Sequence, residues 1–251
     1  YEIEGFGLNG YNTKRKLTIS AGNSGTLGRH LCSLSSRAEN KIKIIGDKSL
    51  SKRDFSRVIE PLKLFGVKIK SKNGCLPVEI QGTNFLRPIS FTEKKGSAQI
   101  KSSLILCGLN TPGITVIKAK KSRNHTELLL KYLKYPIKVK SKGTYDHIEI
   151  KGLNQIKAFD YKIPGDISSA SFLIVLTLLS QKSQLTIKDI NINPSRIGII
   201  SILNKMGARI RFKKKRVYKN EKIANIFIKS VNNLKAINLP KSFNNSSAID
   251  E

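Results

Sequence analysis

The chain has 251 residues and a formal net charge of +29, from 46 lysine and arginine residues against 17 aspartate and glutamate residues. This length allows a sizeable core, in one large domain or two smaller ones. No run approaches the ~18 apolar residues of a membrane span, and no signal peptide opens the chain. Cys32, Cys75 and Cys107 lack metal-ligand spacing and cannot all pair, which favours a reduced, cytoplasmic setting.

The basic charge has two interpretations. Clustered lysine and arginine would indicate a nucleic-acid-binding surface, because cations displace counterions from phosphates. Lysine is instead spread along the chain, apart from the run Lys213 to Arg216, and aromatic residues do not alternate with it as base stacking requires. We therefore expect no nucleic-acid partner. The charge also suits a doubly anionic small substrate.

The predicted elements repeat with a period of about 70 residues. The first half of each repeat is a glycine, then small hydroxyl or amide residues that open an apolar helix. These openings lie at 22–26, 96–99 and 165–169. The helices are expected to continue over 27–34, 100–109 and 170–179. Strands rich in β-branched residues are expected next, at 42–45, 114–117 and 185–190.

The second half of each repeat predicts an amphipathic helix, a turn and a pair of strands. The helical spacing covers 55–65, 125–132 and 199–206, and the following strands begin near 67, 137 and 210. Each repeat therefore reads β-α-β-α-β-β. Such a repeat predicts an α/β or α+β fold in which helices are buried against sheets.

The helix starts are candidate anion sites, because free backbone N–H groups and the helix dipole favour negative charge there. In 23–26, Gly25 lets an anion approach the backbone closely. Ser97 and the pair Asp166 and Ser168 stand at the two later starts. All three clusters could equally be ordinary helix caps.

Two arginines occupy matching places one repeat apart. Arg53 and Arg123 each precede the second helix of a repeat, where a guanidinium can bind phosphate or carboxylate, or simply face solvent. The histidines, His30, His125 and His147, show no spacing for a metal site or a catalytic triad. The residues alone therefore predict a basic repeat protein with several possible anion sites.

Seven stretches taken together resemble the 5-enolpyruvylshikimate-3-phosphate (EPSP) synthases in order and spacing. They are GNSGTLGR (22–29), 46–69, GSAQIKSSLILCGLNTPG (96–113), SRNHTELL (122–129), PGDISSASF (164–172), 193–210 and AIDE (248–251). The resemblance implies an enolpyruvyl-transferase-like fold of two domains, each of three βαβαββ copies. Residues 1–163 would form one domain and 164–251 would begin the other, with the active site in a cleft that closes on the first substrate.

The resemblance also implies the activity. The family transfers the enolpyruvyl group of phosphoenolpyruvate to the 5-hydroxyl of shikimate 3-phosphate, as a cytoplasmic monomer that needs no metal or organic cofactor. It implies these phosphoenolpyruvate-binding residues: Asn23, Gly25, Arg53 and Gln99. Because Gly25 rather than alanine leaves room for a bulkier phosphonate, we expect the complete enzyme to be glyphosate-sensitive.

The resemblance implies these shikimate-3-phosphate-binding residues: Ser97, Ala98, Gln99, Ser122, Arg123 and Asp250. Asp250 is also the implied catalytic base for the attacking hydroxyl. The family's Lys-Ser-x-x-x-Arg and Lys-Glu-x-x-x-Arg segments are absent from the sequence. We therefore expect the chain to be a central fragment that is inactive alone.

Three alternatives stay open. Cys75 follows Gly74, as a reactive cysteine does in the related UDP-N-acetylglucosamine enolpyruvyl transferases. A basic nucleic-acid-binding module would be distinguished by steeply salt-dependent binding that ignores ligand identity. A purely structural repeat protein would leave the polar clusters at three matched helix starts unexplained.

Overall fold

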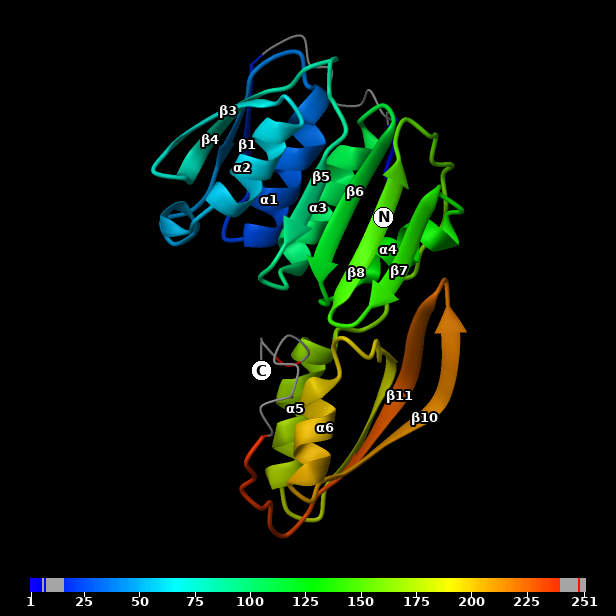
Figure 1. Cartoon of the computed structure of the whole chain (residues 1–251). Helices are drawn as coiled ribbons and strands as arrows, with labels where there is room; N and C mark the ends of the chain where they lie inside the picture. Colours follow the sequence, from blue (N-terminus) through cyan, green and yellow to red (C-terminus); the bar gives the residue numbers. More distant parts are fainter. Residues whose placement is uncertain (6, 8–15, 240–247, 249–251) are drawn as a thin grey trace. The chain divides into compact units, whose positions relative to one another are not determined.

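The computed structural model describes residues 1–5, 7, 16–239 and 248 (Figure 1). The chain divides into two compact units. Unit 1 contains Tyr1–Lys121 and Leu133–Ala158, and unit 2 contains Ser122–Tyr132 and Phe159–Glu251. The chain therefore passes between the units three times. The domain limits 1–163 and 164–251 remain a prediction.

Unit 1 contains two sheets with the same strand order. The first has the order β1-β2-β4-β3, from β1 (Leu17–Ser20), β2 (Ile42–Ile45), β3 (Lys68–Lys72) and β4 (Cys75–Gln81). The second has the order β5-β6-β8-β7, from β5 (Ser90–Glu93), β6 (Ile114–Lys120), β7 (Ile137–Lys142) and β8 (Tyr145–Lys151). In each sheet the first two strands are parallel and the other pairs antiparallel. The sheets are thus two copies of one motif.

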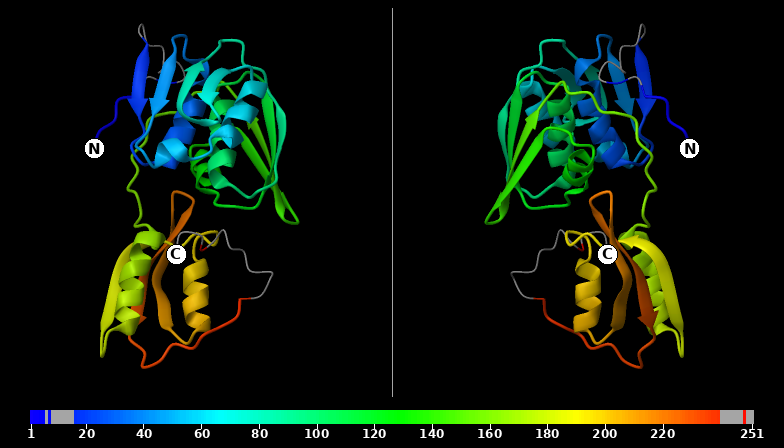
Figure 2. Two further views of the ribbon diagram at one scale, coloured as in Figure 1. Left: turned by 90° about the vertical axis from the view of Figure 1, so that its left-hand side faces the viewer. Right: turned by 90° about the vertical axis from the view of Figure 1, so that its right-hand side faces the viewer.

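The helices of unit 1 form its core layer. They are α1 (Gly25–Leu34), α2 (Ser56–Leu64) and α3 (Ala98–Leu109), with short 3-10 helices at Ser35–Arg37 and Leu50–Lys52. The three α-helices pack on one another and on the inner faces of the sheets (Figures 1 and 2). Phe55, Phe65 and Leu104 are fully buried there. This layer fixes the starts of α1 and α3 beside each other.

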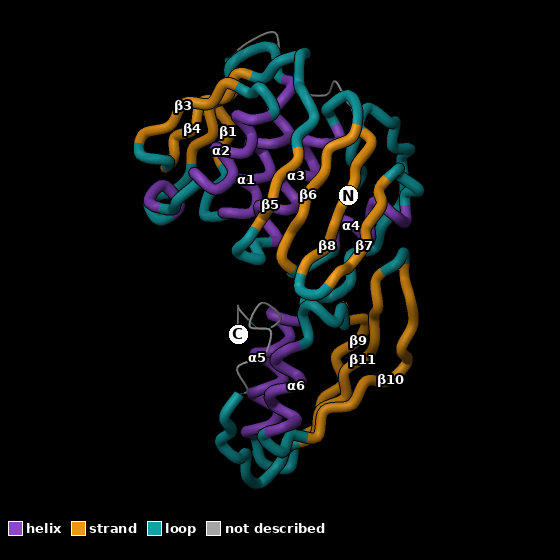
Figure 3. Tube along the Cα trace, viewed as in Figure 1, coloured by secondary structure: helices purple, strands orange, loops and turns teal. Residues whose placement is uncertain are grey.

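Unit 2 contains a third copy of the motif (Figure 3). The third copy is made of α5 (Ile167–Leu179), β9 (Gln184–Asn191), α6 (Gly198–Lys205), β10 (Arg209–Tyr218) and β11 (Glu221–Lys229). Unit 2 also contains α4 (His125–Tyr132), which follows β6 in the second copy. The sheet order is β10-β11-β9, all antiparallel. A parallel bridge from Gly165 to Ile190 stands where β1 and β5 stand in the earlier copies. The first strand of the third copy is therefore reduced to a single bridge.

The predicted repeat and the mixed α/β class are confirmed. The helices after the three glycine-led openings begin at Gly25, Ala98 and Ile167, within a few residues of the expected positions. The expectation that the helices are buried against sheets holds only in part for α5. One side of α5 is buried, but Phe172 and Leu176 of the same helix are 78% and 62% exposed. None of the described helices has the length and apolar character needed to cross a membrane.

Candidate functional site

The start of α1 is a braced helix N-terminus. Ser24 is the N-cap, and its hydroxyl accepts a hydrogen bond from the backbone N–H of Leu27 at 3.1 Å. The Asn23 amide donates to Asp47 Oδ2 at 2.5 Å, while Asp47 Oδ1 accepts from the backbone N–H of Leu50 at 2.7 Å. Asp47 therefore links Asn23, the residue before the N-cap of α1, to the 3-10 helix at Leu50–Lys52.

Gly25 permits a close approach of two guanidinium groups. A Cβ built on Gly25 would lie 2.7 Å from Arg29 Nη1 and 3.6 Å from Arg53 Nη1. A Cβ on Gly28 would lie 3.1 Å from the Phe55 ring. Glycine at these two positions therefore lets α1 lie directly against Arg53 and Phe55, and lets the Arg29 side chain of the same helix lie over Gly25.

Arg29 is held in place from three directions. Its Nη1 donates to Gln99 Oε1 at 2.8 Å, and its Nη2 donates to the Asp54 carbonyl oxygen at 2.9 Å. Its guanidinium also lies over the Phe55 ring, 4.7 Å from the centroid. Gln99 in turn donates from Nε2 to Thr26 Oγ1 at 2.8 Å, so one side chain links α3 to two residues of α1.

The electrostatics of this place favour an anion. Burial, with the neighbouring Arg53 charge, lowers the pKa of Arg29 from its ordinary value, and Asp54 opposes that shift. Among the residues that the structure describes, neither Arg29 nor Arg53 forms an ion pair with a carboxylate. Two guanidinium groups beside a helix N-terminus can therefore bind a phosphate or carboxylate.

The start of α3 completes this part of unit 1. Ser97 is its N-cap, with the hydroxyl 3.4 Å from the backbone N–H of Ile100, and Ala98 is the first helical residue. Gln99, in the first turn of α3, forms hydrogen bonds with Arg29 and Thr26 of α1. Of the predicted residues, Gly25 and Gln99 lie against Arg29, and Arg53 lies against Gly25. Ser97 and Ala98 directly precede Gln99 in the chain, and Asn23 bonds Asp47.

Ser122 and Arg123 lie in unit 2, separated from the first residue of α4 only by Asn124. Ser122 is 7% exposed, and its hydroxyl has no hydrogen-bond partner within the described part of the chain. Three residues after Ser122, His125 Nδ1 lies 2.6 Å from Glu221 Oε1. Burial would raise the pKa of Glu221, but the bond and charge of His125, with the Asn191 and Asn193 amides, outweigh burial and lower it.

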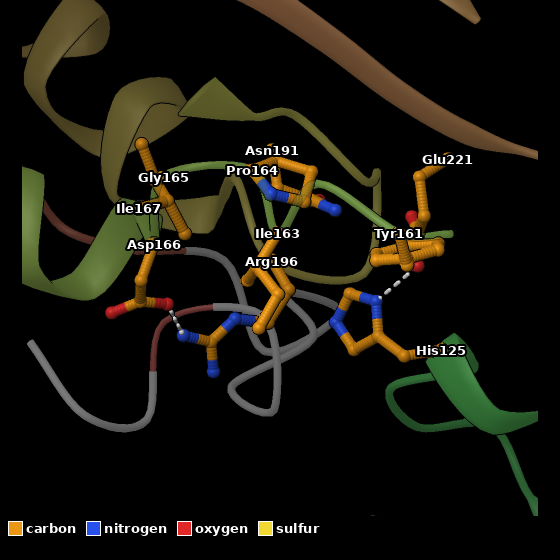
Figure 4. Close-up of a pocket in the computed structure, with 10 residues that line it drawn as sticks. All are labelled: His125, Tyr161, Ile163, Pro164, Gly165, Asp166, Ile167, Asn191, Arg196 and Glu221. Carbon is orange, nitrogen blue, oxygen red and sulfur yellow. Dashed lines mark hydrogen bonds and ion pairs between the residues drawn. The ribbon is translucent and has the colours of Figure 1, made fainter. Parts of the chain in front are cut away.

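Unit 2 also contains a pocket of about 260 Å³ beside the start of α5 (Figure 4). Asp166 caps α5 by accepting from the backbone N–H of Ser169 at 2.9 Å. Arg196, 8% exposed, donates from Nη2 to Asp166 Oδ1 at 3.0 Å and to the Ser168 hydroxyl. The helix start that the sequence offered as an anion site is therefore bonded by a carboxylate and an arginine of the chain itself.

The cysteines take no part in these clusters. Cys32 and Cys107 are fully buried, and burial raises the pKa of each thiol to about 12. Cys75 is the first residue of β4, after the turn at Gly74. Within the described ranges, no group of His, Cys, Asp or Glu side chains is arranged to hold a metal ion.

One predicted residue cannot be placed in the structure, and one residue of the cluster was not predicted. Asp250 lies outside the described residues. Arg29 was not predicted as a site residue, although it ends the stretch GNSGTLGR. The available signal was its spacing: residues i and i+4 share one face of a helix, so Arg29 returns to the face of Gly25.

Three copies of a βαβαββ motif, with an arginine-bounded helix start, define an enolpyruvyl-transferase-like protein. The sequence profile described as EPSP synthase (3-phosphoshikimate 1-carboxyvinyltransferase) matches residues 2–246. The chain belongs to the EPSP synthase family.

Individual relatives agree with this assignment. The chain is 41% identical over 251 residues to the 3-phosphoshikimate 1-carboxyvinyltransferase of Ruthia magnifica subsp. Calyptogena magnifica, covering 99% of the chain and 56% of the relative. The chain is 38% identical to the protein of that name from Endomicrobium trichonymphae, and the match covers 90% of the chain and 52% of that relative. A solved EPSP synthase from Acinetobacter baumannii matches with a TM-score of 0.81 at 34% identity, covering 97% of this chain and 54% of that one. The chain thus spans about half the length of its relatives.

Proposed function

We propose that this chain is part of an enzyme that transfers the enolpyruvyl group of phosphoenolpyruvate to the 5-hydroxyl of shikimate 3-phosphate and releases phosphate. Family membership over residues 2–246 supports the reaction class. The observation that carries the proposal is the pair Arg29 and Arg53 beside Gly25, because it is a positive site without a carboxylate partner among the described residues. Both substrates carry phosphate groups that such a site attracts.

In this proposal, the first turn of α1 and Arg53 bind the phosphoenolpyruvate phosphate. Asn23 and Gly25 border that phosphate, and Gln99 contributes from α3. Arg29 acts with Arg53, a role that its bond to Gln99 supports. The complete enzyme would be inhibited by glyphosate, because a phosphonate fits where Gly25 has no side chain; normal turnover at high glyphosate would contradict this.

Shikimate 3-phosphate is proposed to bind Ser97, Ala98 and Gln99, with Ser122 and Arg123 receiving its phosphate. Asp250 is the proposed base. A carboxylate can take the hydroxyl proton when neighbouring anions and closure raise its pKa. The oxygen adds to the central carbon of phosphoenolpyruvate, whose methylene carbon takes a proton, and the tetrahedral intermediate then expels phosphate. Holding both anions in place can supply ~7–11 kcal/mol of the barrier.

The remaining assignments are also proposals. Residues 1–163 and 164–251 would be the two domains, the protein would act as a cytoplasmic monomer without nucleic-acid partner or cofactor, and the chain alone would be inactive. Against the UDP-N-acetylglucosamine alternative stands the position of Cys75 as the first residue of strand β4, and not within a loop. The family profile favours the shikimate substrate.

The test is calorimetric titration of the 251-residue chain with shikimate 3-phosphate, with phosphoenolpyruvate added in a second series. Arg123→Ala and Arg53→Ala are compared with Arg87→Ala, which removes the same charge from an exposed arginine that donates to the Leu64 carbonyl oxygen. Loss of a bidentate arginine contact should weaken binding roughly tenfold or more. The Arg87 variant should bind as the parent does.

Saturable binding of shikimate 3-phosphate that Arg123→Ala weakens supports the proposal. A folded chain that ignores both substrates but binds a single-stranded oligonucleotide, with affinity falling steeply between two salt concentrations, would replace it with the nucleic-acid function. If Arg123→Ala and Arg87→Ala weaken binding equally, the binding depends on the overall positive charge of the chain and not on Arg123, which would contradict the assigned site.

A further inference from the structure

We propose that the β10–β11 turn of unit 2 positions Ser122 and Arg123 by holding helix α4. This inference rests on the proposed function, in which those two residues receive the substrate phosphate. It concerns residues that the sequence did not connect with the site: Asn193, Lys219, Asn220 and Glu221. We call these four residues the α4 clamp.

The first turn of α4 is held by two side-chain contacts. His125 Nδ1 donates to Glu221 Oε1 at 2.6 Å, because an ionised carboxylate only accepts. Asn193 Nδ2 donates to Asn124 Oδ1 at 2.8 Å and lies 3.3 Å from Glu221 Oε2. Both Glu221 and Asn193 are buried, with exposures of 4% and 3%. The His125 side chain is 41% exposed, so its bond to Glu221 is partly buried. A hydrogen bond to an ionised carboxylate is stronger than one between neutral groups.

The rest of the same helix face contacts the turn itself. Asn220 Nδ2 donates to the Leu128 carbonyl oxygen at 3.3 Å. Lys219 Nζ lies 5.4 Å from the Tyr132 ring centroid and 5.5 Å from the ring of Tyr161. Contacts at 125, 128 and 132 share one helix face, so the clamp engages α4 along its whole length.

The clamp has a fixed backbone. Lys219 and Asn220 both have positive φ, 49° and 66°, between the paired residues Tyr218 and Glu221. Two consecutive residues with positive φ form the tight turn that best fits a two-residue hairpin. The Tyr218 hydroxyl also accepts from the backbone N–H of Lys162 at 2.9 Å. The turn is therefore a rigid support for α4.

The geometry connects the clamp with the proposed phosphate site. Arg123 stands two residues before His125, and Ser122 precedes it directly. A segment this short has few backbone conformations once the next residues are fixed. Fixing Asn124 and His125 therefore limits where Ser122 and Arg123 can lie. Glu221 acts through α4 and is a positioning residue.

The main variant is Glu221→Gln, which keeps the shape of the side chain and removes its charge. The matched control is Asp189→Asn, which removes a carboxylate from a 2.7 Å bond to Arg216 in the same sheet and does not contact α4. Hydrogen exchange of the amides in 122–132 is compared with that of α5, 167–179, in the same chain. Glu221→Gln should speed exchange in 122–132 about three- to tenfold and leave α5 unchanged, because a charge-assisted bond becomes neutral.

The second measurement is the affinity for shikimate 3-phosphate. Glu221→Gln should weaken it about threefold to tenfold, whereas Asp189→Asn should not. In an Arg123→Ala background Glu221→Gln should have a clearly smaller effect, since only the contact from Ser122 is left for it to act on. A merely structural loss would instead lower affinity equally in both backgrounds.

The outcomes separate this inference from the proposed function. Unchanged exchange in 122–132 overturns the clamp. Faster exchange with unchanged affinity, in a chain that binds the substrate, overturns the positioning role. If the parent chain does not bind shikimate 3-phosphate, the proposed function fails, and the exchange result alone supports or overturns the clamp.

Discussion

Replacing Gly25 with alanine should move Arg29. The added Cβ would lie 2.7 Å from Arg29 Nη1, short of the 3.4 Å at which ordinary contact begins, so the guanidinium must withdraw by about 0.7 Å. Such a shift would lengthen the 2.8 Å bond to Gln99 Oε1 to the limit of hydrogen bonding. The main cost is therefore the loss of one charge-assisted bond.

The magnitude follows from two opposing effects. A hydrogen bond to a charged group is worth about 1.5–3 kcal/mol, and the lower end applies because this one is only partly buried. Replacing glycine by alanine within a helix raises the free energy of unfolding by up to about 1 kcal/mol, and by less in the first turn. We expect Gly25→Ala to lower the free energy of unfolding by about 1 kcal/mol.

The assay is urea unfolding followed by circular dichroism, repeated in an Arg29→Ala background. Without the guanidinium the new methyl group has room, so Gly25→Ala should there be neutral or stabilising, giving a coupling of about 1–2 kcal/mol. Equal effects of Gly25→Ala in both backgrounds would refute the steric argument. So would a stabilisation in the parent chain.

The remaining predictions concern other parts of the chain. A thiol reagent should label Cys75 in the native chain but Cys32 and Cys107 only after unfolding, because both are buried with raised pKa values; rapid native labelling of three thiols would contradict this. The lowered pKa of Glu221 stabilises the folded chain above the ordinary pKa of 4.5, and this stability is lost as the pH falls through the lower pKa of the folded state. Glu221→Gln should therefore reduce the slope of unfolding free energy against pH in that acidic range, and an unchanged slope would contradict the lowered pKa. Asp166→Ala should cost about 1 kcal/mol by removing the α5 cap, seen as a lower urea midpoint, and an unchanged midpoint would show that the cap is not needed.

Local patterns predicted much of the fold. Glycine followed by small polar residues located the starts of α1, α3 and α5, because capping depends on neighbouring residues only. The βαβαββ order followed from hydrophobic periodicity. The reduced first strand of the third copy was not foreseen, because one bridge at Gly165 leaves no alternating pattern.

The site was harder to predict, because its contacts join distant parts of the sequence. Arg29 and Gln99 are 70 positions apart, and His125 and Glu221 are 96 apart. Neither partner has a local signal: a single arginine within a helix is usually a surface residue, and a glutamate at a strand start usually faces solvent. The place of Arg123 before a helix made it a candidate anion-binding residue, and the family resemblance added the substrate; its proposed support by Glu221 came from the structure.

The three passages between the units have a consequence for synthesis on the ribosome. Helix α4 is made between β6 and β7, yet it belongs to unit 2. Its partner Glu221 is made 96 residues later. Domains that are continuous in sequence can fold as they emerge, but α4 must wait for β11 before it reaches its final contacts. A gene split after Ala158 would therefore leave the first product carrying a helix without its partner, so we expect co-expressed halves to reassociate through α4.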